Sequence, residues 1–206
     1  MSLNTSGVHH ISAQDDILAR VKRETRQSHE RLESIMPLGR ETFSREQYVG
    51  VLKKFYGMYK PLEAELSRVA DLPNDLDLAQ RRKMSLIEND LRTLGFNDEQ
   101  LQELPEFSAA RHLSVPEALG AMYVMEGATL GGQFISRMVA LQLGLDRKTG
   151  CAFFTSYGAE VGERWHKFGE VVRKRVVSQD DQDRFVTAAT KTFTDFERWV
   201  GKQDHD

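Results

Sequence analysis

A histidine with two charged neighbours is the first group of residues in the sequence that could do chemistry. His29 falls on the apolar side of a predicted helix, where a neutral imidazole can offer a nitrogen to a ligand. Lys22 is two helical turns earlier, about 10 Å along the axis on the same side, and Glu33 is one turn later, near the second ring nitrogen. Such a group fits a ligand gripped at its centre and anionic at one edge. The spacing is common by chance, and a lone histidine on an apolar helix face is more often a core residue.

Glycines concentrate in a second segment, Tyr123 to Gln133, which otherwise has the composition of a strongly apolar helix. Gly127, Gly131 and Gly132 interrupt it. Each glycine inside a helix costs about 0.5–1 kcal/mol relative to alanine, so the three lower the local helix stability by roughly 2–3 kcal/mol. Close helix packing would explain the first two, whereas the adjacent Gly132 favours a bend and a backbone that lies directly on a flat ligand.

Both segments belong to a series of predicted helices. Hydrophobic residues recur at three- and four-residue steps, Asp15 or Asp16 can cap the first helix, and capping boxes begin at Ser44 and Ser114. The expected helices cover about 17–36, 44–66, 76–94, 98–101, 114–143, 149–177 and 180–201. No strand-like alternation bounded by hairpin turns appears in the sequence. The pattern predicts an all-α protein with helices packed in layers.

The composition limits the possible partners. With 206 residues, of which 40% are hydrophobic and 29% charged, the chain fits one globular domain. Its net charge of -3 and its pI near 6.1 lack the basic excess of nucleic-acid-binding proteins. Cys151 is the single cysteine, so no intramolecular disulfide can form, and a cytoplasmic location fits best.

The N-terminal segment and the hydropathy complete this picture. Residues 1–16 are polar and have no apolar stretch like that of a signal peptide, and no window approaches the about 18 apolar residues of a membrane span. We therefore expect a disordered tail over residues 1–16 and one helical domain over residues 17–203, neither exported nor anchored to a membrane.

Three sequence motifs, taken together, are specific enough to indicate a family. Lys-x-x-Thr-x-x-x-His-x-x-Leu-Glu begins at Lys22, and Tyr-Val-x-Glu-Gly-x-x-Leu-Gly-Gly-Gln begins at Tyr123. A third pattern, Tyr-Gly-x3-Gly-x2-Trp-x2-Phe, begins at Tyr157. Together these motifs resemble the bacterial haem oxygenases, most closely those associated with bacteriophytochromes, over about residues 17–200. The resemblance implies a single-domain helical fold that holds haem b between a proximal helix and a glycine-kinked distal helix.

The resemblance also implies a role for individual residues. His29 would be the axial ligand of the haem iron, with Glu33 as its hydrogen-bonding partner and Thr25 on the same side. Lys22 and Tyr123 would hold the propionates. The residues expected to form the distal wall and to close the pocket are Gly127, Ala128, Gly131, Gly132, Phe193 and Phe196. Among these residues, His29 and the three glycines are the ones expected to act in catalysis.

The activity implied is the opening of haem with O2 and an external reductant to biliverdin, with release of CO and Fe2+. The mammalian branch of the family has an aspartate after the first distal glycine, where this chain has Ala128, so a different proton-delivery route is expected. Electrons would come from a ferredoxin or a flavin reductase. The basic sets at Lys22, Arg23 and Arg26 and at 173–175 either dock such an acidic donor or form a solvated face. A bacteriophytochrome would consume the bilin.

Other readings of the sequence stay open. A haem carrier or sensor would use the same pocket without turnover. A carboxylate-bridged di-iron oxidase would need a second Glu-x-x-His pair beside Glu163 and His166. A thiamine-degrading enzyme would need a base beside Cys151, and a purely structural bundle would bind no haem.

Overall fold

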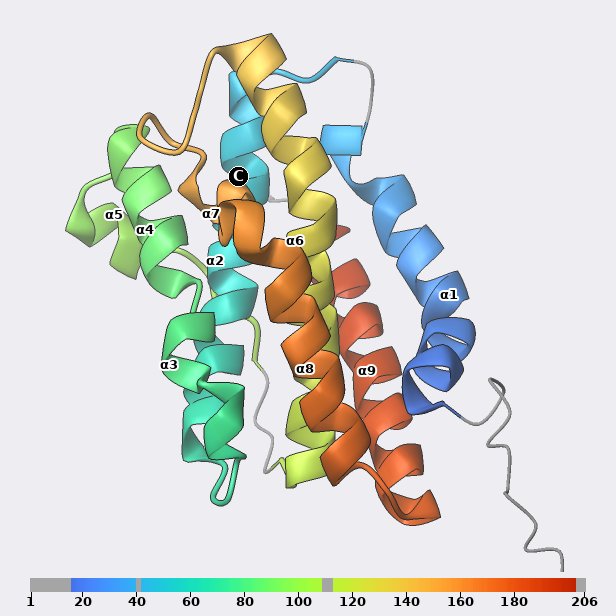
Figure 1. The fold of residues 1–206 in the computed structure, drawn as a ribbon. Helices are drawn as coiled ribbons and strands as arrows, with labels where there is room; N and C mark the ends of the chain where they lie inside the picture. Colours follow the sequence, from blue (N-terminus) through green and yellow to red (C-terminus); the bar gives the residue numbers. More distant parts are fainter. Residues whose placement is uncertain (1–15, 40–41, 109–112, 203–206) are drawn as a thin grey trace, which may run out of the picture.

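The computed structural model describes residues 16–39, 42–108 and 113–202. Within these ranges the regular structure is helical, without strands, which confirms the all-α prediction (Figure 1). The α-helices are α1 (Ile17–Ile35), α2 (Arg45–Arg68), α3 (Leu78–Arg81), α4 (Met84–Thr93), α5 (Asp98–Gln102), α6 (Val115–Leu143), α7 (Ala152–Thr155), α8 (Val161–Arg175) and α9 (Gln179–Val200). Short 3-10 turns lie at η1 (Pro37–Gly39), η2 (Asn74–Leu76) and η3 (Gly158–Glu160). The predicted tail over residues 1–16 lies almost entirely outside the described residues.

The predicted helix starts are confirmed by their caps. The side chain of Asp16 accepts a hydrogen bond from the Leu18 amide (3.4 Å) at the start of α1. The reciprocal capping box at Ser44 begins α2, and the Ser114 amide donates to the Glu117 carboxylate (2.8 Å) at the start of α6. Each cap satisfies backbone amides that have no partner inside the helix.

Two predicted helices are wrong as continuous elements. The segment 76–94 divides into η2, α3 and α4, because Arg82 is extended and the backbone amide of Lys83 turns inward to Glu63 Oε1 (2.6 Å). The segment 149–177 divides into α7, η3 and α8, because Gly150 (φ +121°), Ser156 (φ +27°) and Gly158 (φ +58°) have positive φ values that a right-handed helix does not allow.

The three glycines of α6 do not interrupt it, since this helix is continuous from Val115 to Leu143. The N-terminal half of α6 contains a further glycine, Gly120. At Gly120 the helix lies so close to α9 that a Cβ would come within 2.3 Å of the Phe185 carbonyl oxygen. The close approach of two helices, and not a break, is therefore the main consequence of glycine in this half of α6.

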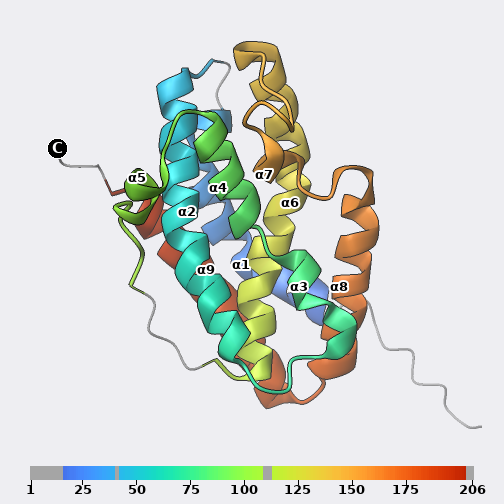
Figure 2. The ribbon, with the colours of Figure 1, turned by 90° about the vertical axis from the view of Figure 1, so that its left-hand side faces the viewer.

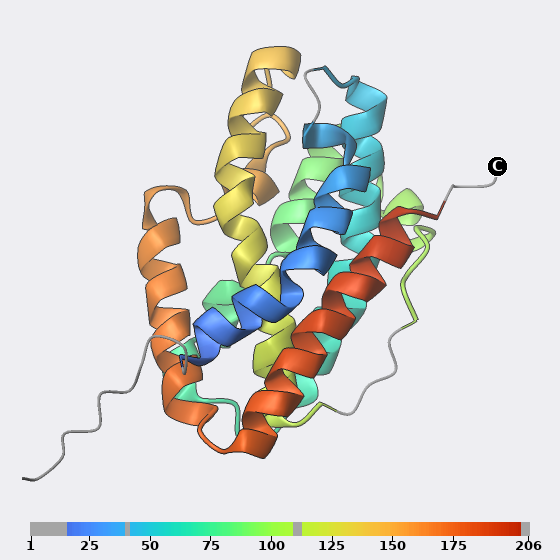
Figure 3. The same cartoon turned by 90° about the vertical axis from the view of Figure 1, so that its right-hand side faces the viewer.

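The helices form layers around α6 and α9, which pack along each other (Figures 1 and 3). α1 rests mainly on α9, on one side of the molecule, and α2 to α5 cover the other side (Figures 1 and 2). The core between α2, α7 and α9 is aromatic, with ring centroids 5.2 Å apart for Phe55 and Phe153 and 5.9 Å apart for Phe55 and Phe196. This packing fixes α1 and α6 on their common support, α9. None of the described helices combines the length and the apolar character that crossing a membrane requires.

Candidate functional site

His29 lies on α1 with about half of its side chain (52%) exposed. Its ring meets Phe193 of α9 edge to face, with the centroids 5.5 Å apart. Nδ1 is 3.4 Å from Glu33 Oε2, so a proton on Nδ1 is favoured and the lone pair of Nε2 is left for a ligand. In the described part of the chain Nε2 has no hydrogen-bond partner. The half-exposed His29 is therefore not an ordinary core histidine. Glu33 lies beside its ring, where a hydrogen-bonding partner was expected, whereas the contact with Phe193 was not expected from the sequence. The role of His29 as an iron ligand stays a prediction.

The remaining residues that were predicted to line the haem site differ in their burial. Thr25 is buried and donates to the Val21 carbonyl (2.7 Å). Burial raises the pKa of the Tyr123 hydroxyl, and the neighbouring Thr25 hydroxyl offsets part of this rise, so the tyrosine is a neutral hydrogen-bond donor at physiological pH. Lys22 is exposed. The structure thus brings Thr25 and Tyr123 together and leaves Lys22 at the surface.

An apolar face of α6 is exposed to solvent. Leu130 is 42% and Phe134 57% exposed, and Ala128 and Gly131 lie on the same exposed part of the helix. A Cβ at Gly131 would meet nothing within 4 Å, and one at Gly127 would meet only Trp165, at 3.8 Å. Large exposed apolar side chains beside bare helix backbone are typical of a surface that an apolar ligand covers.

Gly132 has a different role from the one expected. It is buried, and a Cβ there would lie 2.8 Å from the carbonyl oxygen of Phe154 in α7. Its position about 100° around the helix from Gly131 turns it toward the core. Gly132 therefore serves the packing of α6 on α7. We call the exposed part of α6 around Gly127 and Gly131 the glycine face.

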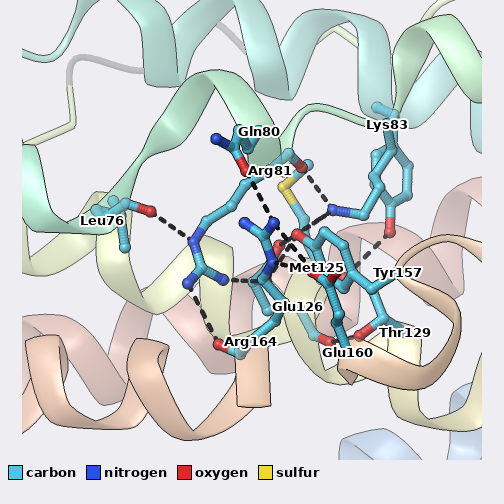
Figure 4. A network of polar contacts seen from close by, with 11 residues as sticks. Leu76, Gln80, Arg81, Lys83, Met125, Glu126, Thr129, Tyr157, Glu160 and Arg164 are labelled. Atoms are coloured by element: carbon cyan, nitrogen blue, oxygen red, sulfur yellow. Dashed lines mark hydrogen bonds and ion pairs between the residues drawn. The ribbon is translucent and has the colours of Figure 1, made fainter. Parts of the chain in front are cut away.

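A buried polar cluster lies on another side of α6, one residue before Gly127 (Figure 4). The Glu126 carboxylate forms an ion pair with Arg81 and a second one with Lys83 (3.3 Å), and it accepts a hydrogen bond from the Tyr157 hydroxyl (2.9 Å). The side chains of the three charged residues are at most 3% exposed. Desolvation lowers the pKa of Lys83, and the Glu126 carboxylate opposes this shift. We define Arg81, Lys83, Glu126 and Tyr157 as the Glu126 cluster.

Sequence reasoning missed most of this cluster. It gave no role to Arg81 or Lys83, which fell within a predicted continuous helix. The structure shows what the residues of the motif that begins at Tyr157 do. Tyr157 belongs to the Glu126 cluster, Trp165 packs against Tyr123 (5.5 Å between ring centroids), and Phe168 is a core residue. A run of basic residues at 81–83 inside an apolar segment was the available signal.

The other chemical readings find little support in the described part of the chain. No group of three residues that could ligate a metal ion occurs there, and His166 and Glu163 are exposed and pair with Glu170 and Lys167. Burial raises the pKa of the Cys151 thiol to about 11, which disfavours the thiolate that a nucleophile requires.

The predicted basic sets are partly neutralised. Arg26 pairs with Glu30 (2.8 Å), and Arg173 pairs with Asp16 (3.0 Å). Lys174 lies 3.4 Å from Asp75. Arg26, Arg173 and Lys174 therefore already have an anionic neighbour, which favours a solvated charged face at these three positions.

The geometry first defines a class of helical protein. In this class α1 carries an accessible imidazole, that of His29, and α6 carries an exposed apolar face with little side-chain cover. Both helices pack on α9. Such a site suits a flat, largely apolar ligand with a metal centre. The model of the family described as "Heme oxygenase" matches residues 15–202. The chain belongs to the haem oxygenase family, whose members are enzymes that bind and degrade haem.

Individual relatives agree with this assignment. The chain is 26% identical over 162 residues to a heme oxygenase of Xanthomonas campestris pv. campestris (strain 8004), covering 77% of this chain and 92% of that protein. Its fold is similar to that of the NO- and CO-bound heme oxygenase from Neisseria meningitidis (TM-score 0.74, 20% identity, 90% of both chains covered). It is also similar to the heme oxygenase from Leptospira interrogans (TM-score 0.72, 16% identity, 90% of this chain and 98% of that one covered).

Proposed function

We propose that this protein opens haem b with O2 and electrons from an external reductant, producing biliverdin, CO and Fe2+. The observation that carries the proposal is the combination of the accessible His29 with the exposed glycine face of α6 on the common support of α9. Haem, when bound, supplies an iron centre that activates O2 and the ring that is oxidised.

The residues present fit this group. His29 would hold the haem iron through Nε2, with Glu33 beside Nδ1 to fix the orientation of the ring. Leu130 and Phe134 offer apolar contact, and the open space at Gly131 lets a flat ring approach the helix backbone. Lys22 and the neutral hydroxyl of Tyr123 are the groups proposed to bind the propionates.

The part of α6 that is proposed to face the haem has no side chain that could supply a proton. No residue from Gly127 to Phe134 has a titratable side chain, and Ala128 stands where the mammalian branch has an aspartate. We infer that ordered water, and no side-chain acid between Gly127 and Phe134, delivers protons on this side of the ligand.

The partners are part of the proposal. Lys22 and Arg23 of α1 would face an acidic electron donor such as a ferredoxin or a flavin reductase. The motifs shared with the bacteriophytochrome-associated type suggest a bacteriophytochrome as the consumer of the bilin, in the cytoplasm.

The test is a haemin titration of the wild type and of His29→Ala, followed by ascorbate or a ferredoxin system in air. In the wild type we expect a Soret band that disappears as biliverdin absorption and CO appear. In His29→Ala we expect loss of this turnover and a displaced or absent Soret band. A stable oxy complex in the wild type would instead indicate a haem carrier or sensor, and no Soret shift would contradict both functions.

A further inference from the structure

The Glu126 cluster lies outside the surface proposed to contact haem, yet it is attached directly to the helix that forms this surface. Glu126 precedes Gly127 in α6, and its carboxylate receives three donors from other elements: Arg81, Lys83 and Tyr157 (Figure 4). Burying three charged groups in this way is expensive, and hydrophobic residues of similar size often give equal stability. A role in fixing one arrangement of the helices would explain why charges are found there.

The cluster connects α6 to several elements at once. Arg81 donates from Nε to the Leu76 carbonyl (2.6 Å) and from Nη2 to the Arg164 carbonyl of α8 (3.2 Å). Lys83 donates from Nζ to Tyr157 Oη (2.6 Å), in the connection that leads into α8. The position of α6 is thereby tied to both ends of α3 and to α8.

The same contacts hold the aromatic neighbour of the glycine face. Arg164 is followed by Trp165, whose ring would lie 3.8 Å from a Cβ on Gly127 and packs against Tyr123. Arg81 therefore binds both Glu126, next to Gly127 in sequence, and the backbone next to Trp165. A shift of the cluster would move the glycine backbone and this ring together.

At Gly127 and Gly131 the glycine face has no side chain that could set its distance from a ligand. Side-chain contact with the ligand is offered only beside the glycines, by Leu130 and Phe134. Because protein interiors are packed closely, the position of such a face depends on what holds the helix from its other sides.

We propose that Glu126 is a positioning residue: held by Arg81, Lys83 and Tyr157, it fixes the glycine face of α6 and Trp165 relative to the haem bound at His29, and thereby the ring edge that is oxidised. The inference rests on the proposed function for its last step. Its geometric part needs only that haem binds.

The test compares Glu126→Gln, which removes the charge and keeps the size, with Asp90→Asn as a matched control. Asp90 is equally buried, but it accepts hydrogen bonds from the amides of Ala152 (2.7 Å) and Phe153 (2.8 Å) at the start of α7 and does not touch α6 through them. Three quantities are measured in each protein: the C–O stretching band of the ferrous haem–CO complex, amide hydrogen exchange over residues 127–132 without haem, and the ratio of biliverdin isomers.

For Glu126→Gln we expect a shifted or split C–O band, exchange over residues 127–132 faster by on the order of tenfold or more, and a changed isomer ratio. Asp90→Asn should lower the melting temperature while it leaves the band and the ratio as in the wild type. A Glu126→Gln protein with the wild-type band and ratio would overturn the proposal, even if its melting temperature fell.

A milder variant covers the case in which Glu126→Gln does not fold. Tyr157→Phe removes one hydrogen bond to Glu126 and no charge. It should shift the C–O band in the same direction by a smaller amount, and an unchanged band would reject the positioning role. If the wild type binds haem and CO but forms no biliverdin, the proposed function fails, while the C–O band and the exchange rates still decide the positioning role.

Discussion

His29 and Glu126 show how differently two residues with proposed functional roles can be placed in one molecule. His29 is half exposed and has Glu33 at 3.4 Å, whereas Glu126 is buried against two cations. A solvated pair such as His29–Glu33 adds little stability, so its value is the orientation of the ring. Substitution of Glu126 would leave Arg81 and Lys83 buried without their anionic partner, so it should affect stability as well as geometry.

Cys151 provides a prediction at the same scale. Burial raises the pKa of its thiol to about 11, so at pH 8 on the order of one thiol in a thousand is ionised in the folded protein. We expect iodoacetamide at pH 8 to label the native protein far more slowly than the urea-unfolded protein, as measured by intact mass. The thiol keeps its proton in the folded state, so the free energy of unfolding should decrease as the pH rises from about 8.5 toward 11.

The control for this prediction is Cys151→Ser, which should not be labelled in either state. Labelling of the native wild type as fast as that of the unfolded chain would show that the thiol is accessible and reactive. It would also reopen the reading of Cys151 as a nucleophile.

At the scale of a helix, α6 uses glycine for two different purposes. Gly132, like Gly120, allows close packing on a neighbouring backbone, with Phe154 and Phe185 as the respective partners. Gly131 has open space where its side chain would be. The same residue type therefore marks a helix contact at one position and the proposed ligand face at the next.

The two adjacent glycines form a matched pair for substitution by alanine. Without haem, Gly131→Ala should raise the free energy of unfolding by about 0.5–1 kcal/mol through helix propensity. Gly132→Ala should lower it by about 1–3 kcal/mol, because the new methyl group would lie 2.8 Å from the Phe154 carbonyl oxygen. Urea denaturation of both proteins measures these values.

Haem binding should respond in the opposite order. The methyl group of Gly131→Ala lies on the proposed ligand face. The Gly131→Ala protein should therefore bind haem more weakly than the Gly132→Ala protein, provided that both are measured under conditions in which they are folded. Equal haem affinity in the wild type and Gly131→Ala would contradict the placement of the ligand on this face.

At the scale of the whole molecule, α9 is the support that brings the two parts of the site together. α1 and α6 both pack along α9 (Figure 3). Phe193 of α9 contacts the ring of His29 directly. A ligand that contacts both α1 and α6 would add to the contact that Thr25 and Tyr123 already make between these two helices.

This arrangement predicts thermal stabilisation by haemin. With free haemin at 100 times its dissociation constant, the free energy of unfolding should rise by about 2.7 kcal/mol. For a domain of this size that corresponds to a rise of roughly 5–10 °C in melting temperature. Differential scanning calorimetry of the wild type and His29→Ala measures the effect. A wild-type melting temperature that does not change with haemin would contradict a site that bridges α1 and α6.

The sequence by itself determined the helical class, the helix caps and the family. Amphipathic periodicity and capping residues such as Asp16 and Ser44 act locally, over one or two turns, so they can be recognised without knowledge of the fold. The motifs around His29 and Tyr123 likewise identified the two helices of the candidate site.

Only the tertiary structure decided where helices break and what each glycine and charge does. The break at Arg82 and Lys83 depends on Glu63 of α2, and the role of Gly132 depends on a backbone oxygen of α7. Arg81 and Lys83 meet Glu126 only because chain segments 43 or more residues apart pack together. Contacts of this kind leave no periodic pattern in the sequence, since each partner is set by packing between elements and not by its neighbours along the chain.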